Sequence, residues 1–353
     1  MSKELLRLPG LVDPHVHLRE PGATQKEDFY TGTCAALAGG YTTVIDMPNN
    51  PEPTTTTEAL REKIRSASAK TVCDVGFYFG ATETNFPEYP MVENEVKGLK
   101  IYLDSTHGSL LVDTLQGLVN TFQYWSGQKP ILVHAEDLSV AKVIGLVAIF
   151  RKPTHFCHIS LESEIELIKK AKEQGLPITC EVTPHHLFLT EEDEKVLKGF
   201  GRMKPPLRSG SDVDALWKNL AVVDIIASDH APHTIEEKQS DNPPFGVPGL
   251  ETTLPLLLTA VAENRLTLEK LIELISTNPQ RIFRLKSSES TFIEVDLAES
   301  CLLDNKNLKT KCGWTPFEGK RVSGRIRRVF LGGRKVFEDG VVLASPGSGK
   351  ILL

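Results

Sequence analysis

Residues 8–22 read LPGLVDPHVHLREPG, and this stretch decides how the rest of the chain is interpreted. It begins with apolar residues, as a buried strand does, and continues with His15, His17 and Arg19. Side chains alternate along a strand, so both histidines are expected to point to one side of it. Two histidines with this spacing are only a weak indication of a metal site. The question is therefore whether other parts of the chain bring further ligands to them.

Seven more short apolar runs follow the first, and helical patterns fill most of the intervals between them. The predicted strands are 11–17, 41–47, 71–79, 98–103, 131–134, 154–158, 178–182 and 223–228. Helices are expected at 27–40, 55–70, 161–175, 212–223 and 249–265. Strands that alternate with helices predict an α/β fold, and eight of them predict a parallel (β/α)8 TIM-like barrel.

The pattern changes near residue 287, where short strands and glycine turns replace the alternation. STFIEVDL and KRVSGRIRRVFLGGRKVFEDGVVL are typical of antiparallel strands, while 298–318 has the mixed composition of a loop. We therefore expect a barrel over residues 8–286. A small C-terminal β-rich lobe is expected over 287–353, joined by residues 1–7.

Composition narrows the class of protein. The chain has 353 residues, a formal net charge of −6 and no long basic run, so neither nucleic acid nor a membrane surface is expected as a partner. The N-terminus lacks the apolar segment of a signal peptide, and the six cysteines show no close pairing. A cytoplasmic protein with reduced thiols is the expectation.

In a TIM barrel the active site lies at the C-terminal ends of the strands, and metal-type residues gather there in this sequence. The candidates after His15 and His17 are Asn49, Lys100, His134, His158 and Asp229. Such ligands suit zinc, with manganese and iron left open. Lys100 is unusual, because a buried neutral lysine can react with CO2 to form a carbamate that bridges two metals. A lysine that reaches the surface or pairs with a carboxylate is the alternative.

With these residues assembled, the sequence resembles dihydroorotase of the amidohydrolase superfamily. The matching motifs are DPHVHLREPG, MPNN, GLKIYL, HAE, CHIS, TPHHL, ASDHAPH, GVPGLET and WTPFEGKRVSGRI. The chain is most like the dihydroorotase domain of the multifunctional protein that also contains carbamoyl-phosphate synthetase and aspartate transcarbamoylase. The resemblance implies reversible cyclisation of N-carbamoyl-L-aspartate to L-dihydroorotate, as a step of pyrimidine synthesis.

The resemblance also implies a binuclear zinc site. His15, His17 and Asp229 would hold the more buried metal, His134 and His158 the other, and a carboxylated Lys100 would bridge them. A hydroxide between the metals would be the nucleophile, and Asp229 would act as general base and then general acid. Cys157 and Glu181 stand beside the sixth and seventh strand ends. They would orient His158, help to hold a third zinc, or serve only as a buried thiol and a helix-start carboxylate.

Substrate contacts follow from the same resemblance. Arg19, Asn49 and His233 would form a pocket for the ring carboxylate, since a guanidinium can grip a carboxylate with two hydrogen bonds. Thr106 would reach the substrate from a closing loop, and Pro248 and Gly249 would contact it. The sequence departs from the family at two places. His107 replaces a phenylalanine of the animal domains, which puts the packing of the closed loop in doubt. Lys204 stands where many bacterial relatives have asparagine, and either a polar contact with the substrate or closing loop or a position facing solvent is expected for it.

Three questions stay open at this stage. Allantoinase and dihydropyrimidinase share the metal ligands, but their substrates lack the ring carboxylate that would pair with Arg19. An inert barrel retained as a scaffold is a further alternative. The resemblance implies a homodimer, and the few residues before the first strand suggest a domain cut from a longer polypeptide, whose neighbouring domains would be its partners.

Overall fold

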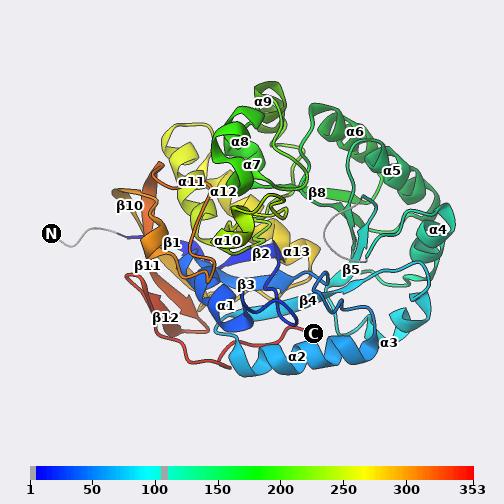
Figure 1. Cartoon of the computed structure of the whole chain (residues 1–353), viewed down its shortest axis with the longest axis horizontal. Coiled ribbons are helices and arrows are strands. Elements are labelled where there is room, and N and C mark those ends of the chain that lie inside the picture. The colour runs from blue at the N-terminus through cyan, green and yellow to red at the C-terminus, as the bar shows by residue number, and fades with distance from the viewer. Residues whose placement is uncertain (1–4, 105–109) are drawn as a thin grey trace.

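The structure is a computed structural model that describes residues 5–104 and 110–353. Its largest sheet has eight parallel strands that follow one another in chain order (Figure 1). These are β2 (Leu11–Val16), β3 (Tyr41–Asp46), β4 (Asp74–Gly80), β5 (Gly98–Tyr102), β6 (Ile131–His134), β7 (Thr154–Phe156), β8 (Ile178–Val182) and β9 (Ile225–Ile226). Val16 pairs with His230 just beyond β9, so the two ends of the sheet meet. The predicted barrel is confirmed.

Helices cover the outside of the strands, as Figure 1 shows for α2 to α6. The helices are α1 (Phe29–Ala38), α2 (Thr57–Lys70), α3 (Tyr89–Val92), α4 (Leu115–Tyr124), α5 (Leu138–Phe150), α6 (Glu162–Glu173), α7 (Pro184–Phe188), α8 (Glu191–Leu197), α9 (Gly210–Lys218), α10 (Ile235–Lys238), α11 (Leu250–Ala262), α12 (Leu268–Ile272) and α13 (Asn278–Ile282). No helix of the described part of the chain is long and apolar enough to cross a membrane.

The apolar core has three clusters, and two of them explain why the strands are apolar on both faces. Side chains such as Phe29, Phe77 and Ile131 pack between the strands and the helices. Inside the barrel, a second cluster that includes Tyr78 and Leu132 fills the interior. Polar residues at the strand ends therefore lie on a packed floor rather than over an open channel.

The lobe is an antiparallel sheet of five strands in the order β1-β10-β11-β12-β13. They are β1 (Leu6–Pro9), β10 (Phe292–Leu302), β11 (Arg321–Leu331), β12 (Arg334–Glu338) and β13 (Val341–Val342). The loop expected from residue 298 begins later, because β10 pairs with β11 as far as Leu302 beyond a bulge. Gly324 of β11 lies against α11, where a Cβ would come within 2.5 Å of the Leu258 side chain.

Two segments tie the lobe to the barrel. Between β10 and β11 the chain reaches the barrel helices, where the backbone N–H groups of Lys309 and Lys311 donate to Glu251 and Glu27. At the other end of the barrel, the last residues run beside β4, and Val75 N donates to Lys350 O over 2.8 Å. The first of these segments approaches the ends of the strands that carry the candidate site.

A buried ion pair stabilises the end of β3. Lys63 Nζ of α2 lies 2.6 Å from Asp46 Oδ2, and both side chains are fully buried. The ammonium also donates to Met47 O over 2.8 Å, and Asp46 accepts from Leu18 N over 2.7 Å. The pair therefore links α2 to the backbone immediately before Arg19.

We predict that Lys63→Met lowers the free energy of unfolding by about 3–5 kcal/mol, because it leaves the Asp46 carboxylate buried and unpaired. Urea titration measures the loss. Lys169→Met is the control, since the Lys169 side chain is 42% exposed and lies 3.9 Å from Glu166. The control should change stability by less than about 0.5 kcal/mol. Equal losses in the two variants would show that the buried pair has no special role.

Candidate active site

A cavity opens at the C-terminal ends of the barrel strands. Residues from several strand ends and from the segments after them surround it. They are His15, His17, Arg19, Asn49, Tyr102, His134, His158, Lys204, Asp229, Ala231, Phe245 and Gly246. Half of the fourteen residues predicted for the site therefore line one cavity, although they come from distant parts of the chain.

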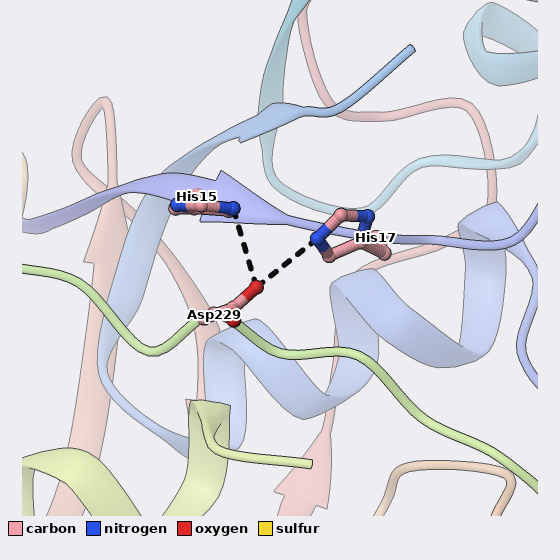
Figure 2. Close-up of side chains that lie close together, drawn as sticks. All are labelled: His15, His17 and Asp229. Atoms are coloured by element: carbon pink, nitrogen blue, oxygen red, sulfur yellow. Dashed lines mark hydrogen bonds and ion pairs between the residues drawn. The ribbon is translucent and has the colours of Figure 1, made fainter. Parts of the chain in front are cut away.

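His15, His17 and Asp229 form the centre of this cavity (Figure 2). His15 Nε2 lies 3.2 Å and His17 Nε2 lies 3.0 Å from the same carboxylate oxygen, Asp229 Oδ1. All three residues are buried. Asp229 has a positive φ of 45°, a conformation that aspartate tolerates better than most residues and that directs its carboxylate toward β2. Three ligand atoms so close together can hold one metal ion.

The electrostatics of the cluster favour a cation. Burial alone would raise the pKa of Asp229, but His15, His17 and His158 hold that pKa well below its ordinary value. Burial alone would lower the pKa of His15, yet Glu181 and Asp229 raise it well above its ordinary value. Two buried carboxylates thus draw positive charge onto the imidazole between them. A metal ion would supply that charge without a proton.

Glu181, at the end of β8, makes more contacts than the sequence analysis expected. One carboxylate oxygen lies against His15 Nδ1 and also accepts from the backbone N of His158 over 3.3 Å. The other lies 3.0 Å from His155 Nε2. The side chain that Glu181 orients is therefore that of His15 and not that of His158. His15, Cys157 and Glu181 also form a second group with atoms close enough to hold a metal.

Lys100 of β5 is fully buried beside this group. Its Nζ donates to Cys157 Sγ over 2.9 Å. Among the described residues, no carboxylate lies within ion-pair distance of it, so the alternative of a paired lysine is not what the structure shows. Carbamate formation needs an amine that is free to react, since CO2 adds to the nitrogen lone pair with release of a proton, and among the described residues no carboxylate holds this amine in an ion pair.

His134 and His158, from the ends of β6 and β7, face each other. His134 Nδ1 lies 2.8 Å from His158 Nε2, and the other nitrogen of His158 has no hydrogen-bond partner in the described structure. Burial lowers the pKa of both imidazoles, so both are neutral near pH 7. Buried neutral imidazoles with an unsatisfied nitrogen fit the coordination of a metal.

Arg19 lies at the opening of the cavity. Its Nε donates to Pro232 O over 3.0 Å, and its Nη2 lies 3.1 Å from His233 Nε2. Burial, Arg19, Lys26 and Lys238 lower the pKa of His233, which is therefore neutral. No carboxylate of the described residues is within ion-pair distance of the guanidinium. Arg19 thus presents hydrogen-bond donors and positive charge to an anion in the cavity, whereas His233 contacts the guanidinium and does not itself line the cavity.

The other residues predicted to bind substrate have additional contacts or lie outside the main cavity. Asn49 Oδ1 lies 2.7 Å from His17 Nδ1, so this side chain orients a histidine in addition to lining the cavity. Pro248 and Gly249 line a separate small pocket with Thr310 and Trp314 rather than the main cavity. Thr106 and His107 lie outside the described residues.

Sequence reasoning did not single out Tyr102 and Phe245, which line the cavity, or Glu136, which contacts two lining residues. Glu136 lies 3.2 Å from His134 Nε2 and 3.5 Å from Lys204 Nζ. Its place two residues after a strand-end histidine is a signal that could have found it. Tyr102 and Phe245 supply apolar walls, and Phe245 gave no signal because its loop follows no strand. Lys204 lines the cavity, so it does not simply face solvent.

Comparison with known proteins places this geometry in a family. The amidohydrolase family model matches residues 6–102. The multifunctional protein CAD of Squalus acanthias is 49% identical over 352 residues, which make up 99% of this chain and 16% of that protein. The chain thus spans a small part of that longer relative. A dihydroorotase of Methanosarcina acetivorans is 36% identical over 402 residues, a match that covers 98% of this chain and 85% of that protein.

Solved structures agree on the architecture. L-hydantoinase of Arthrobacter aurescens superposes with a TM-score of 0.94 at 26% identity, over 98% of this chain and 88% of that one. The inactive dihydroorotase-like domain of the Chaetomium thermophilum CAD-like multifunctional protein gives a TM-score of 0.85 at 25% identity, over 99% and 100% of the two chains. Barrel, lobe and sequence identity lead to one conclusion: this chain belongs to the dihydroorotase family of the amidohydrolases.

Proposed function

We propose that this chain interconverts N-carbamoyl-L-aspartate and L-dihydroorotate, as a dihydroorotase of pyrimidine biosynthesis. One observation carries the proposal. Arg19, which has no carboxylate partner among the described residues, shares a cavity with the buried cluster of His15, His17 and Asp229. A cyclic amide that bears a carboxylate would meet both features at once. Hydantoinases have the same fold, so the fold does not distinguish these substrates, whereas the arginine does.

The residues present fit two zinc ions and a carbamate. His15, His17 and Asp229 would hold one zinc, His134 and His158 the other, and carboxylated Lys100 would lie between them. When bound, zinc would polarise the scissile carbonyl and lower the pKa of water. Cys157 and Glu181 could add a third zinc with His15. The contacts of Glu181 with His15 and His155 support an orienting role equally well.

Proton transfer falls to Asp229. In the hydrolytic direction, water adds to the amide carbon of the ring, and Asp229 accepts its proton. The carbon–nitrogen bond then breaks, and Asp229 returns the proton to the leaving nitrogen. The reverse sequence closes the ring. His15 and His17 hold the pKa of Asp229 low, so the carboxylate is ionised before water adds.

Binding of the substrate carboxylate falls to Arg19, His233 and Asn49. The guanidinium is fixed by its bond to Pro232 O, so little entropy is lost when it binds an anion. Allantoin and dihydrouracil have no carboxylate and would leave the arginine unpaired, at a cost. All the predicted metal ligands are present in this chain, which argues against an inert scaffold.

Assembly and organisation are further proposals. We propose a cytoplasmic homodimer that works beside carbamoyl-phosphate synthetase and aspartate transcarbamoylase domains, as the resemblance to the dihydroorotase domain of the multifunctional protein implies. We also propose a boundary after residue 286 between the barrel and the β-rich lobe. Four of the five strands of the antiparallel sheet, β10 to β13, follow residue 286, and β1 pairs with β10, which supports this division.

Metal removal should test the site directly. We expect about two zinc ions per chain by elemental analysis, and a thermal midpoint that falls when a chelator removes them and recovers with zinc. His17→Ala and His134→Ala should each lose about one ion. Zinc affinity should fall as the pH drops toward 4, because burial lowers the pKa of His17 to about 4 and a proton then competes with the metal for this imidazole. Unchanged zinc content in both variants would rule out these ligands, and Glu192→Gln on exposed α8 is the control.

Substrate choice should depend on Arg19. We expect Arg19→Gln to lower kcat/KM for L-dihydroorotate by about 100-fold, because a charge-assisted bond to the substrate carboxylate is lost. Zinc content should be unchanged, and the weak turnover of dihydrouracil should not fall. Steady-state hydrolysis of both compounds, with exposed Arg61→Gln as the control, measures this. Equal losses on both substrates would contradict a carboxylate pocket, and a wild-type chain inactive on every cyclic amide would leave only the scaffold.

A further inference from the structure

We propose that residues 309–314, the segment between β10 and β11, position the catalytic loop 228–233 from outside the cavity, with Glu27 and Trp314 as the positioning residues. The inference rests on the proposed function, because it assigns catalytic effects to residues that touch no substrate. None of the residues 309–314 lines the main cavity. They would affect the positions of Asp229 and His233 through two buried contacts: Glu27 with His230, and Trp314 with His233.

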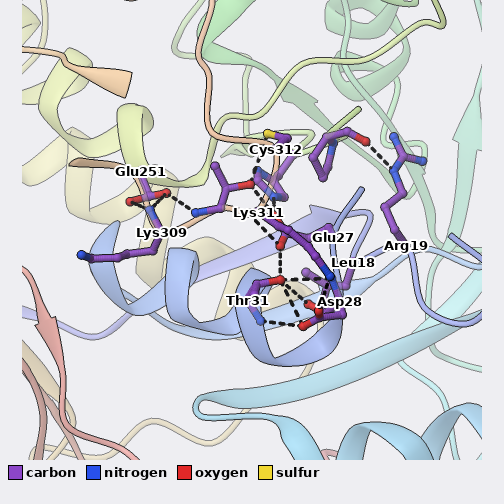
Figure 3. A network of polar contacts seen from close by, with 12 residues as sticks. Leu18, Arg19, Glu27, Asp28, Thr31, Glu251, Lys309, Lys311 and Cys312 are labelled. Carbon is purple, nitrogen blue, oxygen red and sulfur yellow. Dashed lines mark hydrogen bonds and ion pairs between the residues drawn. The ribbon is translucent and has the colours of Figure 1, made fainter. Parts of the chain in front are cut away.

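The first contact centres on Glu27 (Figure 3). Its fully buried carboxylate accepts from the hydroxyl of Thr310 and from the backbone N of Lys311 over 3.2 Å. The hydroxyl of Thr31 on α1 also donates to it. Glu27 Oε2 then lies 3.4 Å from His230 Nε2. A carboxylate from the start of α1 thus joins the 309–314 segment to the residue next to Asp229.

His230 transmits this contact to the catalytic centre. Gly249 N donates to its Nδ1 over 3.2 Å, which leaves Nε2 as the nitrogen that bears hydrogen and faces Glu27. On the backbone, His230 O accepts from His17 N over 2.8 Å. The side chain of His230 is therefore held on one side by Glu27, while its backbone sets the spacing between His17 and Asp229. A shift of this backbone would move the proton-transferring carboxylate.

The second contact is made by Trp314. Its indole Nε1 donates to His233 O over 2.7 Å, and both residues are buried. His233 borders Arg19 in the predicted carboxylate pocket. Lys238 lies over the Trp314 ring and donates to the carbonyls of Arg202, Pro244 and Gly246, so the same indole also supports the wall of the cavity.

The segment itself is held by polar contacts rather than by strand pairing. Glu251, at the start of α11, accepts from the backbone N–H groups of Lys309 and Thr310 over 2.8–2.9 Å. A buried polar network is costly when it is only partly satisfied, so it specifies one arrangement. The 309–314 segment therefore has a single defined position against the catalytic loop.

The two contacts predict different kinetic effects. Glu27→Gln and Thr310→Val should lower kcat by about 10-fold with KM changed less than about twofold, because Asp229 is displaced. Thr310→Ser, which keeps the hydroxyl donor, should restore kcat. Trp314→Phe keeps the ring but loses the indole donor, and it should raise KM for L-dihydroorotate by about 5–10-fold with a smaller change in kcat. Steady-state kinetics on zinc-loaded full chains measures the effects on kcat and on KM separately.

Two matched controls are available in the chain. Glu88 accepts from the backbone N and the hydroxyl of Thr57, as Glu27 does from Lys311 and Thr310. Trp217 Nε1 donates to Leu187 O over 2.7 Å, as Trp314 does to His233. Glu88→Gln and Trp217→Phe should leave kcat and KM unchanged. If the controls lose as much activity as the test variants, or if the test variants lose none, the inference is wrong.

Failure of the proposed function would be visible separately. If the wild-type chain turned over no cyclic amide, the rate at which a chelator removes zinc would still test the positioning of Asp229. We expect that rate to rise several-fold in Glu27→Gln and to stay at the wild-type value in Glu88→Gln. Identical rates in all three proteins would overturn the inference without reference to any substrate.

Discussion

Closure of the barrel between β2 and the residues after β9 is the contact on which the site depends. His17 N donates to His230 O over 2.8 Å, and Val16 pairs with His230. The residues joined there are more than 200 positions apart in the chain, and they place His15 and His17 around one carboxylate oxygen of Asp229. Every other feature of the cavity is arranged around this point. A displaced last strand would leave the histidines without their carboxylate.

Buried charge is the second constraint. The floor of the cavity is an apolar core, so each ionisable group at the strand ends must find a partner or lose its charge. Asp229 and Glu181 share His15, Asp46 has Lys63, and Glu27 accepts from the segment after β10. Lys100 and Arg19 have no such partner among the described residues. In the proposed chemistry Lys100 forms a carbamate, and Arg19 binds the carboxylate of the substrate.

Much of the architecture could be predicted because it follows from the local spacing of apolar and polar residues in the sequence. All eight barrel strands lie where apolar runs predicted them, although β9 shrinks to Ile225–Ile226. Strand ends in a barrel share one face, so His134, His158 and Asp229 could be grouped with His15 before any coordinates. The extension of β10 to Leu302 was missed, because its exposed outer half has the composition of a loop and is stabilised only by pairing with β11.

The sequence by itself determined the barrel, the metal-type residues at its strand ends and the family to which they point, since periodicity and motif spacing are local properties of the chain. Only the tertiary structure decided which groups touch. It turned Glu181 toward His15, set Asn49 on His17, moved Pro248 and Gly249 out of the main cavity and brought residues 309–314 behind the catalytic loop. These contacts join residues far apart in the chain, and no local pattern encodes the few ångströms that separate a ligand from its support.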